Sequence, residues 1–178
     1  VRVNGIVAKA GTPVRPGDVI TTGPKSEVAA VIGTDAFLIR ENSRVEFGGV
    51  AGDALVQAMR IVTGAMLSVF SKGQKREIRT ATATIGIRGT GIYIEAEPNR
   101  TYACTCYGEV VLVPVDDPGS AETVRTKHHD APRYIYPKGM PKMIEAAPVV
   151  NHTDTELALL EGLAGRKVPF PPYSPYPS

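Results

Sequence analysis

Apolar and polar positions alternate along the chain from its start to about residue 136. The period of two is clearest at residues 44–47 and 91–97, where it places every second side chain on the same face of a strand. Spacing typical of a helix is missing from this part of the sequence, apart from an ambiguous window at residues 53–62. The pattern predicts strands that each bury one face.

Successive runs rich in Val, Ile, Thr and Tyr carry this pattern, and turn-forming residues separate them. We expect strands within residues 3–11, 18–23, 27–33, 36–49, 59–73, 76–97, 102–113 and 121–129. The 18 glycines and 15 prolines among 178 residues suit many short strands joined by tight turns. We therefore predict an all-β fold. A sandwich, a barrel and a β-solenoid all fit, because strand spacing alone does not choose between them.

The composition changes near Pro137. We predict a β domain at residues 1–136 and a C-terminal extension at residues 137–178. The extension begins with a segment punctuated by prolines, which we expect to lie extended over the surface of the β domain. It ends at residues 168–178 with five prolines and three aromatic residues, a composition typical of a recognition arm that binds in a groove.

One short helix is predicted within this extension, at about residues 153–164. Thr153 and Glu156 have the spacing of a capping box, in which the two side chains satisfy free amide groups of the first turn. Gly165 supplies a stop. Leucines at spacings of three form a narrow apolar stripe that must pack on the β domain or on a partner: Leu157, Leu160 and Leu163.

The charge pattern argues against two classes of partner. The formal net charge is +2, and the Lys and Arg residues are scattered, whereas a nucleic-acid groove or an anionic membrane surface needs a dense basic patch. No apolar run approaches the roughly 20 residues that cross a bilayer, so we expect no membrane span in this chain. The sequence also carries no nucleophile elbow, P-loop or metalloprotease helix motif, and we predict that the protein is not an enzyme.

Three stretches resemble the FecR-type domain of bacterial cell envelopes: residues 14–47, 59–70 and 78–97. The Arg88-Gly89-Thr90 step is the most specific part, and the resemblance extends over about residues 1–114. It implies a β-rich, exported module in the periplasm or outside the cell, with solenoid-like stacked turns and no catalytic residues. In the best-known members, a cytoplasmic tail and a membrane helix connect the domain to a sigma factor. This sequence shows neither part, so we expect a protein-binding scaffold or signal-relay module instead.

The two cysteines of the chain, Cys104 and Cys106, stand one residue apart in a predicted strand. Their side chains would therefore project from the same face. His128 and His129 follow after one apparent turn, and a neighbouring strand would bring one of them beside the thiols. In a regular strand the two histidines face opposite ways, whereas an irregular turn would let both bind. The four residues form a candidate metal site for zinc, copper, or iron including an iron–sulfur centre.

Other roles for these residues remain open at this stage. The cysteines could form a disulfide, which would be strained between same-face neighbours of one strand, or they could be two inert buried thiols. Asp130 is a candidate acceptor for a ligating imidazole. We assign His152 to the start of the helix rather than to the metal.

Two functional hypotheses follow. The first is a non-catalytic envelope module that binds another envelope protein or complex subunit through its sheet surface and its C-terminal arm. The alternative is a small metal-binding electron-transfer or metal-carrier subunit of a larger envelope complex, and it rests on the Cys/His group alone.

Overall fold

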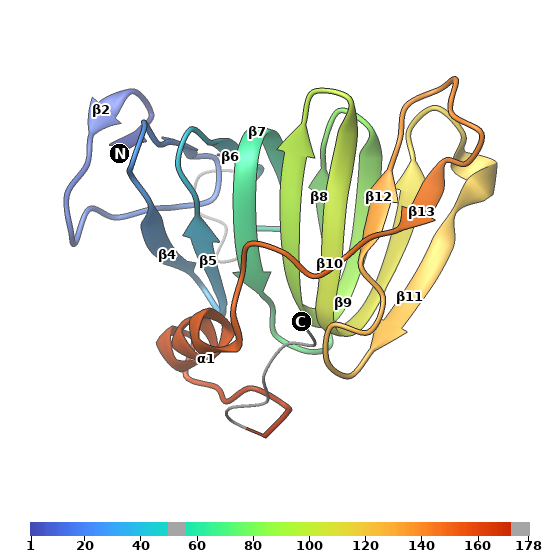
Figure 1. Cartoon of the computed structure of the whole chain (residues 1–178). Coiled ribbons are helices and arrows are strands. Elements are labelled where there is room, and N and C mark those ends of the chain that lie inside the picture. The colour runs from blue at the N-terminus through green and yellow to red at the C-terminus, as the bar shows by residue number, and fades with distance from the viewer. Residues whose placement is uncertain (50–55, 172–178) are drawn as a thin grey trace.

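The computed structural model describes residues 1–49 and 56–171, and within them the strands form one large sheet that does not close into a barrel (Figure 1). The N-terminal strands are β1 (Arg2–Val3), β2 (Ile6–Val7), β3 (Val19–Thr21), β4 (Val28–Ile32), β5 (Asp35–Ile39) and β6 (Arg44–Phe47). They are followed by β7 (Ala58–Val69), β8 (Lys75–Arg79), β9 (Ala83–Glu97), β10 (Arg100–Pro114), β11 (Glu122–Thr126), β12 (Arg133–Ile135) and β13 (Ile144–Ala146). A 3-10 turn, η1 (Pro118–Ser120), and one helix, α1 (Asp154–Leu163), complete the described elements. The predicted all-β fold with one short C-terminal helix is confirmed.

The sheet is organised around three long strands, β7, β9 and β10. The first half of β9 pairs with β8 and its second half pairs with β7. On its other edge, β9 pairs with β10 along the whole length of both strands. The described pairings are antiparallel except for β7 with β8. The strand order is β13-β12-β10-β9-β8-β7-β6-β3-β1-β2, with β11 beside β10, and β4 beside β5, which itself pairs with β7.

Side chains from the two faces of this sheet form two separate apolar cores, because neighbouring residues of a strand point to opposite faces. In β9, Ile92 and Ile94 belong to the first core and Tyr93 to the second. In β10, Ala103 belongs to the first core and Cys104 to the second. The period-two pattern thus places the cysteines on the second face. That face is covered by α1, and the chain leading to the helix crosses β9 and β10 (Figure 1).

A bulge in β10 shapes the region around the second cysteine. Thr105 pairs with Ile92 and Tyr107 pairs with Gly91, so Cys106 is an extra residue with no cross-strand partner in the register. Both Cys106 and Tyr107 consequently reach the second core. Gly108 follows at a φ of 96°, and a Cβ there would lie 2.7 Å from the carbonyl oxygen of Gly89, so the bend requires glycine.

The C-terminal extension is part of the same fold. β13 pairs with β12, so the extension adds a strand to the sheet, and the boundary at residue 136 stays a prediction. The predicted capping box of α1 is present, with Thr153 as N-cap and Glu156 at N3. Leu157 and Leu160 are fully buried, while Leu163 is 49% exposed and lies outside the expected stripe. Residues 172–178 of the predicted arm lie outside the described residues. In the described part of the chain, no helix has the length and apolar character needed to cross a membrane.

Candidate metal centre

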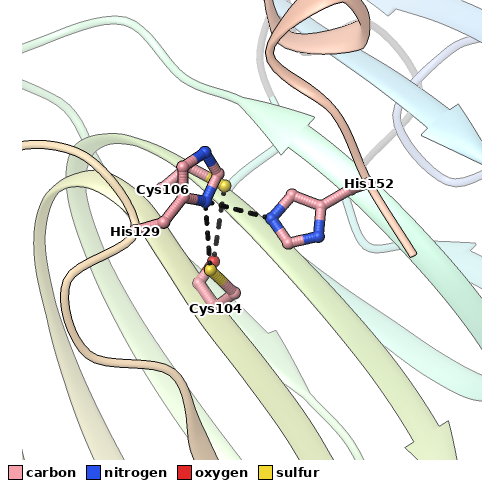
Figure 2. Close-up of side chains that lie close together, drawn as sticks. All are labelled: Cys104, Cys106, His129 and His152. Carbon is pink, nitrogen blue, oxygen red and sulfur yellow. Dashed lines mark hydrogen bonds between the residues drawn. The ribbon is translucent and has the colours of Figure 1, made fainter. Parts of the chain in front are cut away.

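Two cysteines and two histidines meet beneath the segment that leads into α1 (Figure 2). Cys104 and Cys106 come from β10, His129 from the turn after β11, and His152 from the chain between β13 and α1. All four side chains are buried, and their four sulfur and nitrogen ligand atoms lie within 4.8 Å of one another. Three segments that are far apart in the sequence therefore contribute the side chains of one Cys2His2 group.

The spacing of these atoms fits one small ion. The sulfur of Cys104 lies 3.3 Å from Nδ1 of His129, and Nε2 of His152 lies 3.2 Å from the same nitrogen. A tetrahedral zinc ion with bonds of about 2.0–2.3 Å keeps its ligand atoms roughly 3.3–3.8 Å apart. The group is thus close to the separation that a single ion requires. A two-iron cluster is a poorer fit, because it holds the ligands of its two irons at opposite ends.

Hydrogen bonds fix which nitrogen of each imidazole faces the sulfurs. His152 Nδ1 lies 2.6 Å from the carbonyl oxygen of Val150, and His129 Nε2 lies 3.1 Å from a carboxylate oxygen of Asp154. Both oxygens are acceptors, so these two nitrogens carry the protons. The remaining nitrogens, His129 Nδ1 and His152 Nε2, then face each other with lone pairs 3.2 Å apart. His129 Nδ1 also lies 3.3 Å from the Cys104 sulfur. Either a hydrogen shared among these three atoms or a metal ion between them satisfies the contacts.

The backbone around His129 turns its ring toward the cysteines. His129 has a φ of 52°, in the left-handed region, and its N–H donates to the carbonyl oxygen of Cys106 at 2.9 Å. A non-glycine residue in this region is strained, so the surrounding contacts must hold it there. The irregular turn considered from the sequence is therefore present. It nevertheless brings only one histidine of the pair to the sulfurs.

The metal-free group favours a thiolate. The hydrogen bond from Cys106, followed by contacts with His129 and His152, lowers the pKa of Cys104 to about 4 in spite of burial. Burial, and then the neighbouring Cys104, raise the pKa of Cys106. Burial alone would lower the pKa of His129, but Cys104 and Asp154 outweigh it and raise that pKa. A thiolate is the form of cysteine that binds metals, so the group is prepared for a cation.

Tyrosine side chains hold His152, the fourth member of the group, in place. The ring of Tyr93 stacks on His152 with centroids 4.6 Å apart, at an interplanar angle of 25°. Tyr102 donates its hydroxyl hydrogen to the Pro148 carbonyl oxygen at 2.7 Å and accepts from the N–H of Val150 at 3.2 Å. The segment before His152 is thus tied to β10, the strand that carries the cysteines.

Three of the four predicted site residues come together, and the fourth does not. Cys104, Cys106 and His129 share the group, whereas His128 Nε2 lies 2.8 Å from the carboxylate of Asp154. His152, which the sequence analysis assigned to the start of the helix, takes its place. Composition is a signal that could have found it, since the chain has three histidines.

The acceptor for His129 also differs from the prediction. Asp130 accepts from the backbone N–H of Lys127 at 2.9 Å and so shapes the turn, while Asp154 accepts from the His129 ring. The two cysteines are free thiols in this structure, not a disulfide. Whether the group binds a metal stays a prediction.

Comparisons with known proteins show similarity of fold. No protein-family model matches the sequence, and no curated protein matches it significantly. Two crystal structures, both described as a "putative anti-sigma factor" from Parabacteroides distasonis ATCC 8503, have TM-scores of 0.59 and 0.58 at 11% sequence identity. The similarity covers 81% of this chain but 65% and 64% of those chains, so the chain spans slightly less than two thirds of their length. The coarser part of the FecR resemblance, a fold like that of anti-sigma-factor proteins, is thus supported.

Proposed function

We propose that this chain is a non-catalytic regulatory module of the bacterial cell envelope, in the periplasm or outside the cell, that acts by binding another protein. The observation that carries the proposal is the similarity of fold to structures described as anti-sigma factors. An anti-sigma factor works through a protein–protein contact rather than through a reaction. The FecR-type stretches of the sequence support the envelope location.

The edge strand β4 is the surface that best fits such a partner. In the described part of the chain, β4 pairs with β5 alone, so its other edge offers unpaired backbone groups. A groove of about 650 Å³ follows this strand and is lined by apolar residues that include Val1, Val3, Val14 and Val31. An extended segment adds to such an edge through main-chain hydrogen bonds and places alternate side chains in the groove. We propose a partner that supplies an extended, apolar segment.

A matched pair of substitutions tests this surface. Val31→Lys puts a charge beside the edge of β4, and Val115→Lys makes the same change at the residue that follows β10. The two valines are 43% and 47% exposed. We expect wild type and V115K to co-purify with one stoichiometric partner from envelope extracts, and V31K to lose it. A partner retained equally by V31K, or a wild-type chain that is a partner-free monomer under every condition, would contradict the proposal.

We also propose that Cys104, Cys106, His129 and His152 hold one zinc ion, which stabilises the module. The convergence of two soft sulfur atoms and two imidazole nitrogens within 4.8 Å supports the ligand set, and their burial supports a closed, structural site. Blue-copper sites use two imidazoles, one thiolate and a weak, long axial ligand, whereas this group has two cysteines. A coloured, redox-active ion would instead favour the alternative function, an electron-transfer subunit.

A further inference from the structure

We propose that zinc in this group fastens the C-terminal extension to the sheet, so that loss of the ion releases residues 147–166 and uncovers the apolar face below them. The inference rests on the proposed zinc site and concerns what that site regulates. Of the four ligands, His152 alone belongs to the extension, and the other three belong to the β domain. Figure 2 shows His152 reaching the group from the segment before α1, across from His129.

The position of His152 couples the ion directly to the helix. α1 begins at Asp154, two residues after the ligand, and Asp154 itself contacts both imidazoles of the His128–His129 pair. A bound ion would therefore hold the residue before the helix N-cap directly, and the first helical residue indirectly through His129. Movement of the helix away from the sheet requires His152 to leave the ion, so binding and docking must be linked.

The surface under the extension is apolar. Leu157 and Leu160 of α1 are fully buried in the second core, where β5 contributes Leu38 and β7 contributes Leu67. If α1 moved away, Leu157 and Leu160 would be exposed on the helix, and Leu38 and Leu67 would be exposed on the sheet. A contiguous apolar patch of this kind is typical of a protein-binding surface, and the same sheet carries the proposed partner edge at β4.

Contacts other than the ion also hold the extension, some partly exposed and some buried. Arg40 pairs with Glu156 at 2.7 Å, and both side chains are partly exposed. Further along, Glu161 accepts from Tyr107 and pairs with Arg166 at 2.7 Å. α1 has ten residues, a length at which an isolated helix is not stable in water. Without the ion, the extension keeps two buried leucines, these polar contacts, the contacts of Asp154 with the His128–His129 pair and the Tyr102 hydrogen bonds. We propose that these together are too weak to keep α1 docked.

Hydrogen exchange of the full chain, read by mass spectrometry, tests the coupling. If the released state cannot bind zinc, free zinc at about 100 times its Kd should protect the amides of α1 about 100-fold more than in the chelated protein. The centres of β7 and β9 should change much less. Tyr107→Phe removes a docking hydrogen bond without touching a ligand, so zinc should still restore protection in that variant. His152→Ala should leave α1 weakly protected whether zinc is present or absent.

Elemental analysis of the same samples separates the two proposals. If the protein binds zinc stoichiometrically but the hydrogen exchange of α1 is unchanged after chelation, the proposed fastening of the extension by zinc is refuted and the zinc site is retained. If chelation opens the whole sheet together with α1, local release is also refuted. If wild type binds no zinc, both the zinc site and the fastening of the extension by zinc are refuted. The test of the β4 edge is independent of this result.

Discussion

The Nε2 atom of His152 lies 3.2 Å from Nδ1 of His129, although 23 residues separate the two histidines in the sequence. Each ring uses its other nitrogen to donate to an acceptor, the Val150 carbonyl or the Asp154 carboxylate. A shared hydrogen or a metal ion therefore satisfies the contacts among these nitrogens and the Cys104 sulfur, which lies 3.3 Å from His129 Nδ1. This pair, with the two cysteine sulfurs, makes up the proposed ligand set, on which the metal-binding and thiolate predictions rest.

Replacing His152 and His128 one at a time distinguishes the ligand set proposed from the structure from the set expected from the sequence. His152→Ala removes a ligand atom, so we expect the purified variant to lose stoichiometric zinc. His128→Ala removes a residue that contacts Asp154 rather than the sulfurs, so zinc should be retained at one ion per chain. Metal content by mass spectrometry checks both variants. Retention by H152A together with loss by H128A would reverse the assignment.

Asp154 should tune the affinity without being a ligand to the ion. Asp154→Asn removes the charge that orients the His129 ring, and loss of such an acceptor typically weakens metal binding about 10–100-fold. Asp130→Asn is the matched control, because an amide oxygen still accepts from the turn N–H of Lys127, and we expect less than about a threefold change. Competition titration with a zinc-binding dye measures both affinities. Equal affinities in the two variants would argue against the role of Asp154.

Removal of the metal should lower thermal stability. At free zinc of about 1,000 times Kd, binding adds about 4 kcal/mol to the free energy of unfolding. For a chain of 178 residues this corresponds to a Tm about 8–16 °C higher. We expect chelation to remove that increment in wild type and to leave the Tm of a Cys106→Ser variant unchanged. A wild-type Tm insensitive to chelation would count against a structural ion.

The metal-free protein should carry a thiolate at neutral pH. The pKa of Cys104 is lowered from its ordinary value of 9.0 to about 4, so the unfolded chain binds more protons than the folded chain between these pH values. The thiolate therefore adds stability that is fully present above pH 9 and lost as the pH falls through about 4. The raised pKa of His129 opposes this gain above pH 6.5.

Ultraviolet absorbance of the thiolate follows this titration. Folded, metal-free protein should lose its thiolate signal only near pH 4, and urea-unfolded protein near pH 9. His129→Ala should move the folded midpoint upward, because it removes one of the contacts that lower the pKa. A folded midpoint near pH 9 would show that the cluster does not stabilise the thiolate.

A buried ion pair outside the site provides a test of the fold itself. Arg76 Nε lies 2.8 Å from Asp35, and both side chains are 1% exposed. Asp35→Ala leaves the guanidinium buried without its partner and should lower the free energy of unfolding by about 3–5 kcal/mol. Glu77→Ala breaks the exposed pair with Arg79 and should change it by about 1 kcal/mol or less. Urea unfolding compares the two variants, and equal losses would contradict the burial of the Asp35 pair.

Local patterns predicted most of the fold. Alternation at residues 91–97 indicated the second half of β9, and the Thr153–Glu156 spacing indicated the start of α1. β12 and β13 were not expected, because each has only three residues and lies in a stretch punctuated by prolines. Such short strands are stabilised by their neighbours in the sheet, which a local pattern does not reveal.

The site was harder to predict than the fold, for physical reasons. The common face of Cys104 and Cys106 followed from the period of a strand. The choice between His128 and His129 depended on which of the two adopts the left-handed conformation in an irregular turn. Histidine is enriched in that conformation, but this applies to both residues equally. His152 reaches the site only because β13 and the Tyr102 contacts lead the extension back across β10. Its role is a long-range contact, invisible to local spacing.

The metal content of wild-type protein, measured by elemental analysis and native mass spectrometry after gel filtration, tests the central claim most directly. We predict one zinc ion per chain, bound by Cys104, Cys106, His129 and His152, and absent from the Cys106→Ser variant. One copper or iron ion in its place would contradict the assignment of zinc. Wild-type protein that, after incubation with zinc, holds no more of it than the Cys106→Ser variant would contradict the metal site as a whole.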